Sequence, residues 1–268
     1  MLKDISLGQY IPGTSVIHRM DPRLKIVLTL AYIVVLFMAK GPLSYGLVLL
    51  TLGLIIVLSR IGVRFVLRSV RPLLFIILFT AVLNMFHVDG DVLWSWWILK
   101  ITRQGIETAI YMALRIAMLI SGTFVLLNYT TSPIMLTDGI EQLLGPLKRI
   151  HVPVHELAMM MTIALRFIPT LIEETDKIMS AQKARGADFE TGNVIRRAKA
   201  LIPMLVPLFV SAFRRADELA VAMECRCYRG SEGRTRLRTL KLQGLDYVAI
   251  AIAAVLAAGI ITLGVVLP

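Results

Sequence analysis

Long apolar runs alternate with short polar segments along much of the chain. Five runs come close to the roughly 20 mostly apolar residues that a helix needs to cross the hydrocarbon core of a membrane. They are residues 24–39, 43–59, 72–87, 105–128 and 246–267. A helix pairs its own backbone polar groups, which an irregular segment exposed to lipid cannot do. The pattern therefore predicts an all-α integral membrane protein with about five transmembrane helices.

Residues 129–230 do not follow this pattern. Two stretches of about 30 residues, 153–185 and 193–226, begin apolar and end charged. The apolar halves of both stretches approach the length of a full span, but charged residues such as Glu156 and Arg166 argue against counting them as two further spans. We expect both to be helices that begin in or against the membrane and end in water. Prolines inside them predict that each is kinked or divided: Pro169, Pro203 and Pro207.

These patterns divide the chain into three parts. Residues 1–128 hold four transmembrane helices, 129–230 form a cytoplasmic region of long, partly amphipathic crossing helices, and 231–268 hold a basic linker and the last transmembrane helix.

The positions of the cations predict the orientation. Lysine and arginine collect on the cytoplasmic side of membrane proteins. Here they precede the first run, separate the second from the third, and precede the fifth, so the N-terminus is predicted to be cytoplasmic. These cations are Lys3, Arg19, Arg23, Lys25, Arg60, Arg64, Arg68, Arg71, Arg229, Arg234, Arg236, Arg238 and Lys241. In the opposite loop, Trp94, Trp96 and Trp97 are typical of an interfacial aromatic belt.

Composition agrees with a lipid environment and excludes other classes. The chain has 268 residues, of which 57% are hydrophobic, and a formal charge of +11. A soluble domain is nearer 45–50% apolar. The cations lie beside apolar runs, without the aromatic-lined basic surface of a nucleic-acid-binding protein. Two cysteines, Cys225 and Cys227, cannot build a disulfide framework and without nearby partners make a poor metal site.

The sequence offers no catalytic constellation. It has no phosphate-binding G-x-x-x-x-G-K-[ST] motif and no zinc-binding H-E-x-x-H motif, so we expect no ATP hydrolysis and no metal site in this chain. A lipid-modifying enzyme would need converging acids, whereas the acidic run at 173–176 spreads around its helix. Glu107 and Arg115 lie in the fourth run, and we interpret Arg115 as a structural partner for a carbonyl or carboxylate inside the bundle.

Two arginines at helix ends are the main candidates for function. Arg185 is followed by Gly186, which suits the left-handed residue after a helix, and a basic residue there offsets the helix dipole. This local explanation suffices for one arginine. It explains less well why Arg226 ends the next helix in the same way. Guanidinium groups are suited to forked contacts with carboxylates, so the pair is predicted to dock on two acidic grooves.

A run of methionines in the first long helix allows two interpretations. Met159, Met160 and Met161 are either buried core or part of a surface that accepts several partners. Unbranched thioether side chains repack easily against different surfaces, which suits the second interpretation.

At this point the chain resembles a known family. "YIPGTSVIHRMDPRLKI", the central block "LTDGIEQLLGPLKRIHVPVHELAMMMTIALRFIPTL" and "AQKARG" are similar to segments of the T component, the transmembrane scaffold of energy-coupling factor (ECF) transporters. Ala184, Arg185 and Gly186 match the first Ala-Arg-Gly signature. In the second, cysteines replace the alanine and the glycine, so that Cys225, Arg226 and Cys227 stand there. Asp21, Pro22 and Arg23 match a further family motif, to which we assign a structural role.

The resemblance implies a function and partners. The T component couples two ATP-binding-cassette ATPase subunits, which bind ATP and magnesium, to vitamin or micronutrient uptake in the prokaryotic cell membrane. Its signature arginines would contact the ATPases. An exchangeable substrate-binding S component would rest on the apolar helix faces, for which we expect Met159, Met160, Met161, Pro169, Pro203 and Pro207. The chain itself would be non-catalytic and bind no cofactor. The alternative is the permease subunit of a conventional ABC importer, which has one coupling loop.

Overall fold

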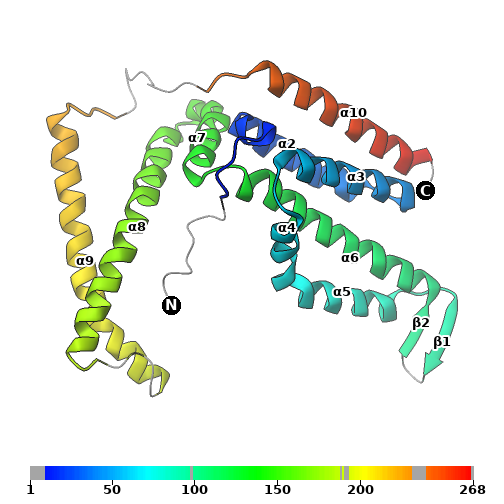
Figure 1. Cartoon of the computed structure of the whole chain (residues 1–268), viewed down its shortest axis with the longest axis horizontal. Helices are drawn as coiled ribbons and strands as arrows, with labels where there is room; N and C mark the ends of the chain where they lie inside the picture. The colour runs from blue at the N-terminus through cyan, green and yellow to red at the C-terminus, as the bar shows by residue number, and fades with distance from the viewer. Residues whose placement is uncertain (1–9, 97–98, 188, 190–192, 231–239, 267–268) are drawn as a thin grey trace. The chain divides into compact units, whose positions relative to one another are not determined.

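The computed structural model describes residues 10–96, 99–187, 189, 193–230 and 240–266. Within these residues the chain forms two units. A helical bundle contains 10–143 and 240–266, and a pair of long helices lies within 144–230. The described residues are almost entirely helical, with one two-stranded hairpin (Figure 1).

The elements follow one another along the chain in the order that the apolar runs predict. The bundle contains α1 (Val16–Arg19), α2 (Pro22–Met38), α3 (Gly41–Ser59), α4 (Val63–Val70), the 3₁₀ turn η2 (Arg71–Leu73), α5 (Leu74–His87), β1 (Val92–Trp96), β2 (Leu99–Thr102), α6 (Arg103–Thr123), the π-helical turn η3 (Phe124–Tyr129), α7 (Pro133–Leu143) and α10 (Gly244–Val266). The second unit contains η4 (Gly145–Ile150), α8 (Val154–Ala184) and α9 (Val194–Cys225).

Five helical stretches in the described residues are long and apolar enough to cross a membrane, as predicted, but their membership differs. Four contain most or all of a predicted span: α3, 63–87, 103–129 and α10. The fifth is α8, which the sequence analysis treated as the weaker candidate because of its charges. The run 24–39 forms α2, whose 17 residues are near the lower limit for a spanning helix. The chain is a multi-pass membrane protein.

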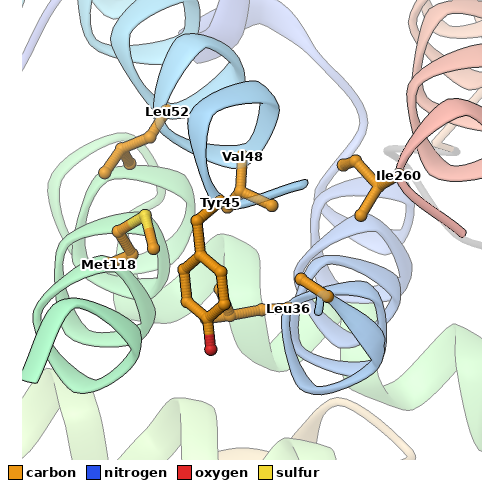
Figure 2. Packing of buried hydrophobic residues seen from close by; sticks show 7 residues of the cluster. Leu36, Tyr45, Val48, Leu52, Met118 and Ile260 are labelled. Carbon is orange, nitrogen blue, oxygen red and sulfur yellow. The ribbon is translucent and has the colours of Figure 1, made fainter. Parts of the chain in front are cut away.

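The core of the bundle joins α2, α3, α6 and α10. Figure 2 shows Leu36, Tyr45, Val48, Met118 and Ile260 converging from these four helices. Such interdigitation fixes the helices against one another, since dispersion contacts between them hold a bundle together in lipid. The first predicted run therefore contributes to the core of the bundle despite its short length.

Arg115 has the structural role that was predicted for it. Its Nη2 donates to the carbonyl oxygen of Ala39 at 3.3 Å, just beyond the end of α2. Its guanidinium carbon lies 5.7 Å from the ring centroids of both Phe37 and Tyr45. Glu107 instead forms an exposed pair with Arg103 at 3.4 Å. The two charged residues of this span therefore do not form one site.

The loop between α5 and α6 contains a hairpin that the sequence analysis missed. Strands β1 and β2 pair antiparallel, and Asp91 with Gln104 closes their base through bonds of 2.8 and 3.1 Å. The strands were not predicted because they have only five and four residues and lie between two long helical patterns. The predicted aromatic belt stays a prediction, because Trp97 and the side chains of Trp94 and Trp96 lie outside the described part of the structure.

Candidate functional site

The end of α8 is a tight turn that positions Arg185. Arg185 is the residue that caps the helix, and Gly186 follows with a φ of +86°. The amide of Gly186 donates to the carbonyl of Lys183, and that of Ala187 to the carbonyl of Gln182, both at 3.0 Å. This is a Schellman motif, which satisfies carbonyls that a helix end leaves free.

The end of α9 has the same turn. Arg226 caps the helix, and Cys227 takes the left-handed position with a φ of +53°. Its amide donates to Glu224 at 2.8 Å, and the Tyr228 amide donates to Met223 at 3.1 Å. The glycine that the family signature places at this position is therefore not needed for the turn. The left-handed conformation costs a non-glycine residue about 1–2 kcal/mol.

The ends of α8 and α9 at Arg185 and Arg226, here called the tips, are accessible to a partner. The side chains of the two signatures are exposed: Ala184, Arg185, Cys225, Arg226 and Cys227. Within the described residues, neither arginine has a hydrogen-bonding or ion-pair partner for its guanidinium group. Both thiols are free. The tips thus present two uncompensated positive charges in the same backbone setting.

An ion pair joins the two long helices, and its two residues are equally far along the sequence from the terminal arginines Arg185 and Arg226. Arg215 Nη2 of α9 donates to Glu174 Oε2 of α8 at 2.6 Å, in a half-buried position. Arg185 follows Glu174 by eleven residues, and Arg226 follows Arg215 by eleven residues. At 1.5 Å per residue, each arginine is about 16 Å along its helix from the ion pair.

Each long helix has an arm, which is the segment from its ion-pair residue to its terminal arginine. The two arms point in opposite directions. A second contact joins Gln182 Nε2 of α8 to the carbonyl of Pro203 in α9 at 3.5 Å. This contact is later than Glu174 along α8 but earlier than Arg215 along α9, so the helices pack antiparallel. The ion pair therefore lies between the two tips.

On each long helix, the prolines lie on the other side of the ion pair from that helix's own terminal arginine. Pro169 precedes Glu174, and Pro203 and Pro207 precede Arg215. Of the two predicted outcomes, a kink or a division, division does not occur, since α8 and α9 are continuous over 31 and 32 residues. Figure 1 shows α9 bent in its first part, as proline inside a helix produces. Each arm from ion pair to arginine is free of proline and its kinks.

An exposed apolar surface follows α8 and α9. Met160 and Met161 are 54% and 55% exposed, so they are not core residues in the described structure, and Met159 is half-buried. On α9 the exposed apolar residues recur every three to four positions, on one broad face. They are Leu201, Ile202, Leu205, Val206, Phe209, Val210 and Phe213. The predicted contact residues Pro169, Pro203 and Pro207 are also exposed.

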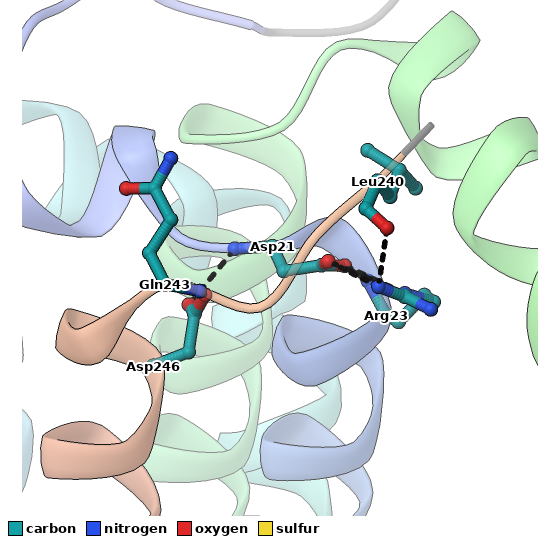
Figure 3. A network of polar contacts seen from close by, with 5 residues as sticks. All are labelled: Asp21, Arg23, Leu240, Gln243 and Asp246. Carbon is teal, nitrogen blue, oxygen red and sulfur yellow. Dashed lines mark hydrogen bonds and ion pairs between the residues drawn. The ribbon is translucent and has the colours of Figure 1, made fainter. Parts of the chain in front are cut away.

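The Asp-Pro-Arg motif ties the beginnings of α2 and α10 together. Asp21 caps α2 by accepting the amide of Arg23, whose side chain binds the same carboxylate at 2.7 Å. The Asp21 amide donates to Asp246 Oδ1 at 3.0 Å, and Asp246 Oδ2 accepts the Gln243 amide at 2.7 Å (Figure 3). Arg23 also donates to the carbonyl of Leu240 at 3.1 Å. The motif therefore has the structural role that was assigned to it.

These contacts among Asp21, Arg23, Leu240, Gln243 and Asp246, here called the clasp, also shift the pKa of Asp21. Burial by itself would raise the pKa of Asp21, but the hydrogen bonds and positive charge of Arg23 outweigh it and hold the pKa below its ordinary value. Sequence reasoning missed Asp246 because it is 225 residues away from Asp21.

Two cations assigned to membrane orientation have structural roles. Arg23 belongs to the clasp, and Lys25 is only 1% exposed. Lys25 Nζ donates to the carbonyl of Thr130 at 2.9 Å and to Thr131 Oγ1 at 3.2 Å. Lys3, Arg234, Arg236 and Arg238 lie outside the described residues. Among the described residues, no three His, Cys, Asp or Glu side chains gather to hold a metal ion.

Comparison with known proteins gives a consistent match. Residues 13–237 match the family model CbiQ, described as cobalt transport protein. A protein of Ruminiclostridium cellulolyticum named energy-coupling factor transporter transmembrane protein EcfT is 56% identical over 255 residues, which cover 95% of each chain. Proteins of the same name from Thermosediminibacter oceani and Bacillus subtilis are 54% and 48% identical, over 96% of this chain and 97% of theirs.

Proposed function

The chain belongs to the CbiQ family and is related over nearly its whole length to energy-coupling factor transmembrane proteins, and from this premise we propose that it couples two ATPase subunits to solute uptake. The observation that carries the proposal is the repetition of one arginine-tipped Schellman turn at the ends of α8 and α9. Each turn would bind one ATP-binding-cassette subunit, which holds the ATP and magnesium. This chain is non-catalytic and binds no cofactor.

The chemistry of each tip suits an acidic groove. A helix ends with free carbonyls and a partial negative charge, which would repel a carboxylate. Here the Schellman bonds occupy some of those carbonyls, and Arg185 or Arg226 places a guanidinium group at the end. The guanidinium fork binds carboxylates through two parallel hydrogen bonds. Each tip would therefore bind acids in a fixed orientation.

The antiparallel helices would transmit ATPase movement. When the ATPases close on ATP, they would move Arg185 and Arg226 relative to one another. The Glu174–Arg215 ion pair joins α8 and α9, and each of its residues lies eleven positions before the terminal arginine of its own helix. A shift at the tips then changes the angle between the helices at this contact. Since neither arm contains proline, each would move as a stiff rod.

The exposed apolar surface would carry a separate substrate-binding membrane subunit. Met160, Met161 and the apolar face of α9 would contact this S component, with Pro169, Pro203 and Pro207 beside them. Apolar contacts without a fixed charge pattern allow different S components to bind the same surface. Substrate selectivity, for a vitamin or a metal, would then belong to the S component.

The same proposal specifies location and orientation. The chain would reside in a prokaryotic cell membrane with its N-terminus in the cytoplasm. Both arginine tips would then face the cytoplasm, where ATP is available.

The test is copurification of the ATPases with a charge-reversed chain. Arg185→Glu together with Arg226→Glu places acid against acid at both tips, and loss of one desolvated charge partner costs about 2–5 kcal/mol. We expect the double variant to lose both ATPases during affinity purification in mild detergent. Lys177→Glu with Arg214→Glu, which makes the same charge change at exposed positions of the same helices, should retain them.

Retention of both ATPases by the double variant would refute the docking role of the arginines. If instead the wild-type chain purified with a soluble solute receptor and no S component, the conventional permease would be the better assignment.

A further inference from the structure

Four arginines lie within twelve residues around α4. Arg60 ends α3, Arg64 and Arg68 lie in α4, and Arg71 begins η2. The segment 60–71 contains no acidic residue. All four side chains are exposed, and within the described residues none of them forms an ion pair or hydrogen bond with a carboxylate. This is a concentrated positive charge without compensation.

The helix places three of these charges on one face. Arg64, Arg68 and Arg71 are spaced by four and three residues, which brings them onto one side of an α-helix. Val66 and Ser69, on the other side, are buried against the bundle. The helix is therefore fixed with its arginines outward.

Contacts with η3 hold α4 in this orientation. The Tyr129 hydroxyl donates to the carbonyl of Phe65 at 3.1 Å, and the two rings meet edge to face at 6.5 Å. Val66 packs in a buried cluster with Val125 and Tyr129. The basic face is thus part of a packed element and not of a loose loop.

The stretch 63–87, which is long and apolar enough to cross a membrane, contains α4, η2 and α5. Its arginines lie in α4 and at Arg71, and α5 contains none. Figure 1 shows α4 running across the direction of α5, so α4 lies near the membrane plane if α5 crosses it. Beside the arginines, Val63 and Leu67 are 60% and 66% exposed. An apolar edge next to a basic face is typical of a helix that lies in the headgroup layer.

We propose that α4 binds the phosphate headgroups of anionic phospholipids through Arg64, Arg68 and Arg71, with Arg60 beside them. The apolar edge of Val63 and Leu67 contacts the upper part of the acyl chains. Membrane orientation alone requires cations in this loop, but it does not require their alignment on one face of a helix that is packed against the bundle. The site would hold the end of α5 at a fixed depth in an anionic leaflet.

The experiment measures lipid selectivity of the full chain. Purified protein in detergent is titrated with phosphatidylglycerol or phosphatidylcholine, and bound lipids are counted by native mass spectrometry. Near a membrane surface each arginine contributes about fivefold in affinity for anionic lipid. We therefore expect the wild type to prefer phosphatidylglycerol, and Arg64→Gln with Arg68→Gln and Arg71→Gln to lower this preference by more than about tenfold.

A matched control removes three charges elsewhere. Lys177, Lys199 and Arg214 are exposed on α8 and α9, and their replacement by Gln should leave the preference within about twofold. The lysine variant of the three α4 arginines should retain most of the preference, because it keeps the charge, and so separates charge from folding. Equal binding of both lipids by the wild type would overturn the proposal. An equal loss in the control triple variant would do the same.

Discussion

At the residue scale, Cys227 adopts the left-handed conformation of the turn after α9, although a residue with a side chain is poorly suited to it. Its φ of +53° is in the region that glycine usually occupies, yet the Schellman bonds at the end of α9 match those at the end of α8. The two Schellman hydrogen bonds at this helix end offset the steric cost of the left-handed conformation. The arginine before it, Arg226, is consequently held in the same setting as Arg185.

We predict that Cys227→Gly stabilises the chain. Glycine adopts the left-handed conformation without the steric cost of a side chain, so the free energy of unfolding should rise by up to about 1 kcal/mol. The measurement is the thermal unfolding midpoint of the purified chain in detergent, with ATPase binding as a second readout that should be unchanged.

Cys225→Gly is the matched control, with the opposite sign. Cys225 is the last residue of α9, where glycine weakens a helix by up to about 1 kcal/mol. A lower midpoint for Cys227→Gly, or a higher one for Cys225→Gly, would contradict the account of this turn.

At the scale of elements, α8 and α9 are joined by the Glu174–Arg215 ion pair and by the hydrogen bond from Gln182 to the carbonyl of Pro203. Of these two contacts, the ion pair of Glu174 with Arg215 is the one between charged side chains. A half-exposed pair contributes on the order of 1 kcal/mol. That is too little to hold the fold but enough to bias the angle between two helices.

We predict that Glu174→Arg lowers the uptake obtained per ATP hydrolysed by about fivefold, as loss of about 1 kcal/mol implies. Two like charges would then face each other at the contact. The complex should still assemble, because both tips are intact. The measurement is solute uptake and ATP hydrolysis by the reconstituted complex in the same vesicles.

Rescue by the swapped pair makes this prediction specific. Glu174→Arg combined with Arg215→Glu restores opposite charges and should recover the uptake-to-hydrolysis ratio. Glu173→Arg changes an exposed neighbour by the same charge and should have little effect. If the swap failed to recover the ratio while Glu173→Arg was equally harmful, the ion pair would have no part in coupling.

At the scale of the whole molecule, local patterns in the sequence predicted most helices but few of the contacts between them. The apolar runs located α2, α3, α5, α6 and α10 because lipid requires long apolar helices. The charged residues of α8 argued against a membrane span, although this helix is long and apolar enough to cross a membrane.

The tertiary contacts of the candidate site had no local signal. Glu174 and Arg215 are 41 residues apart, and Asp21 and Asp246 are 225 apart, so no periodicity links them. Lys25 was assigned to membrane orientation because it flanks an apolar run, although its side chain is buried. The arginines of the two tips were predictable because a helix end has a local signature.

The central claim is that each arginine tip binds one ATPase, and the most direct measurement is the number of ATPases bound per chain. Native mass spectrometry of the purified complex, prepared without nucleotide so that the ATPases do not hold one another, counts them. We predict two for the wild type, one for Arg185→Glu, one for Arg226→Glu and none for the double variant. Two ATPases bound to both single variants and to the double variant would contradict the account.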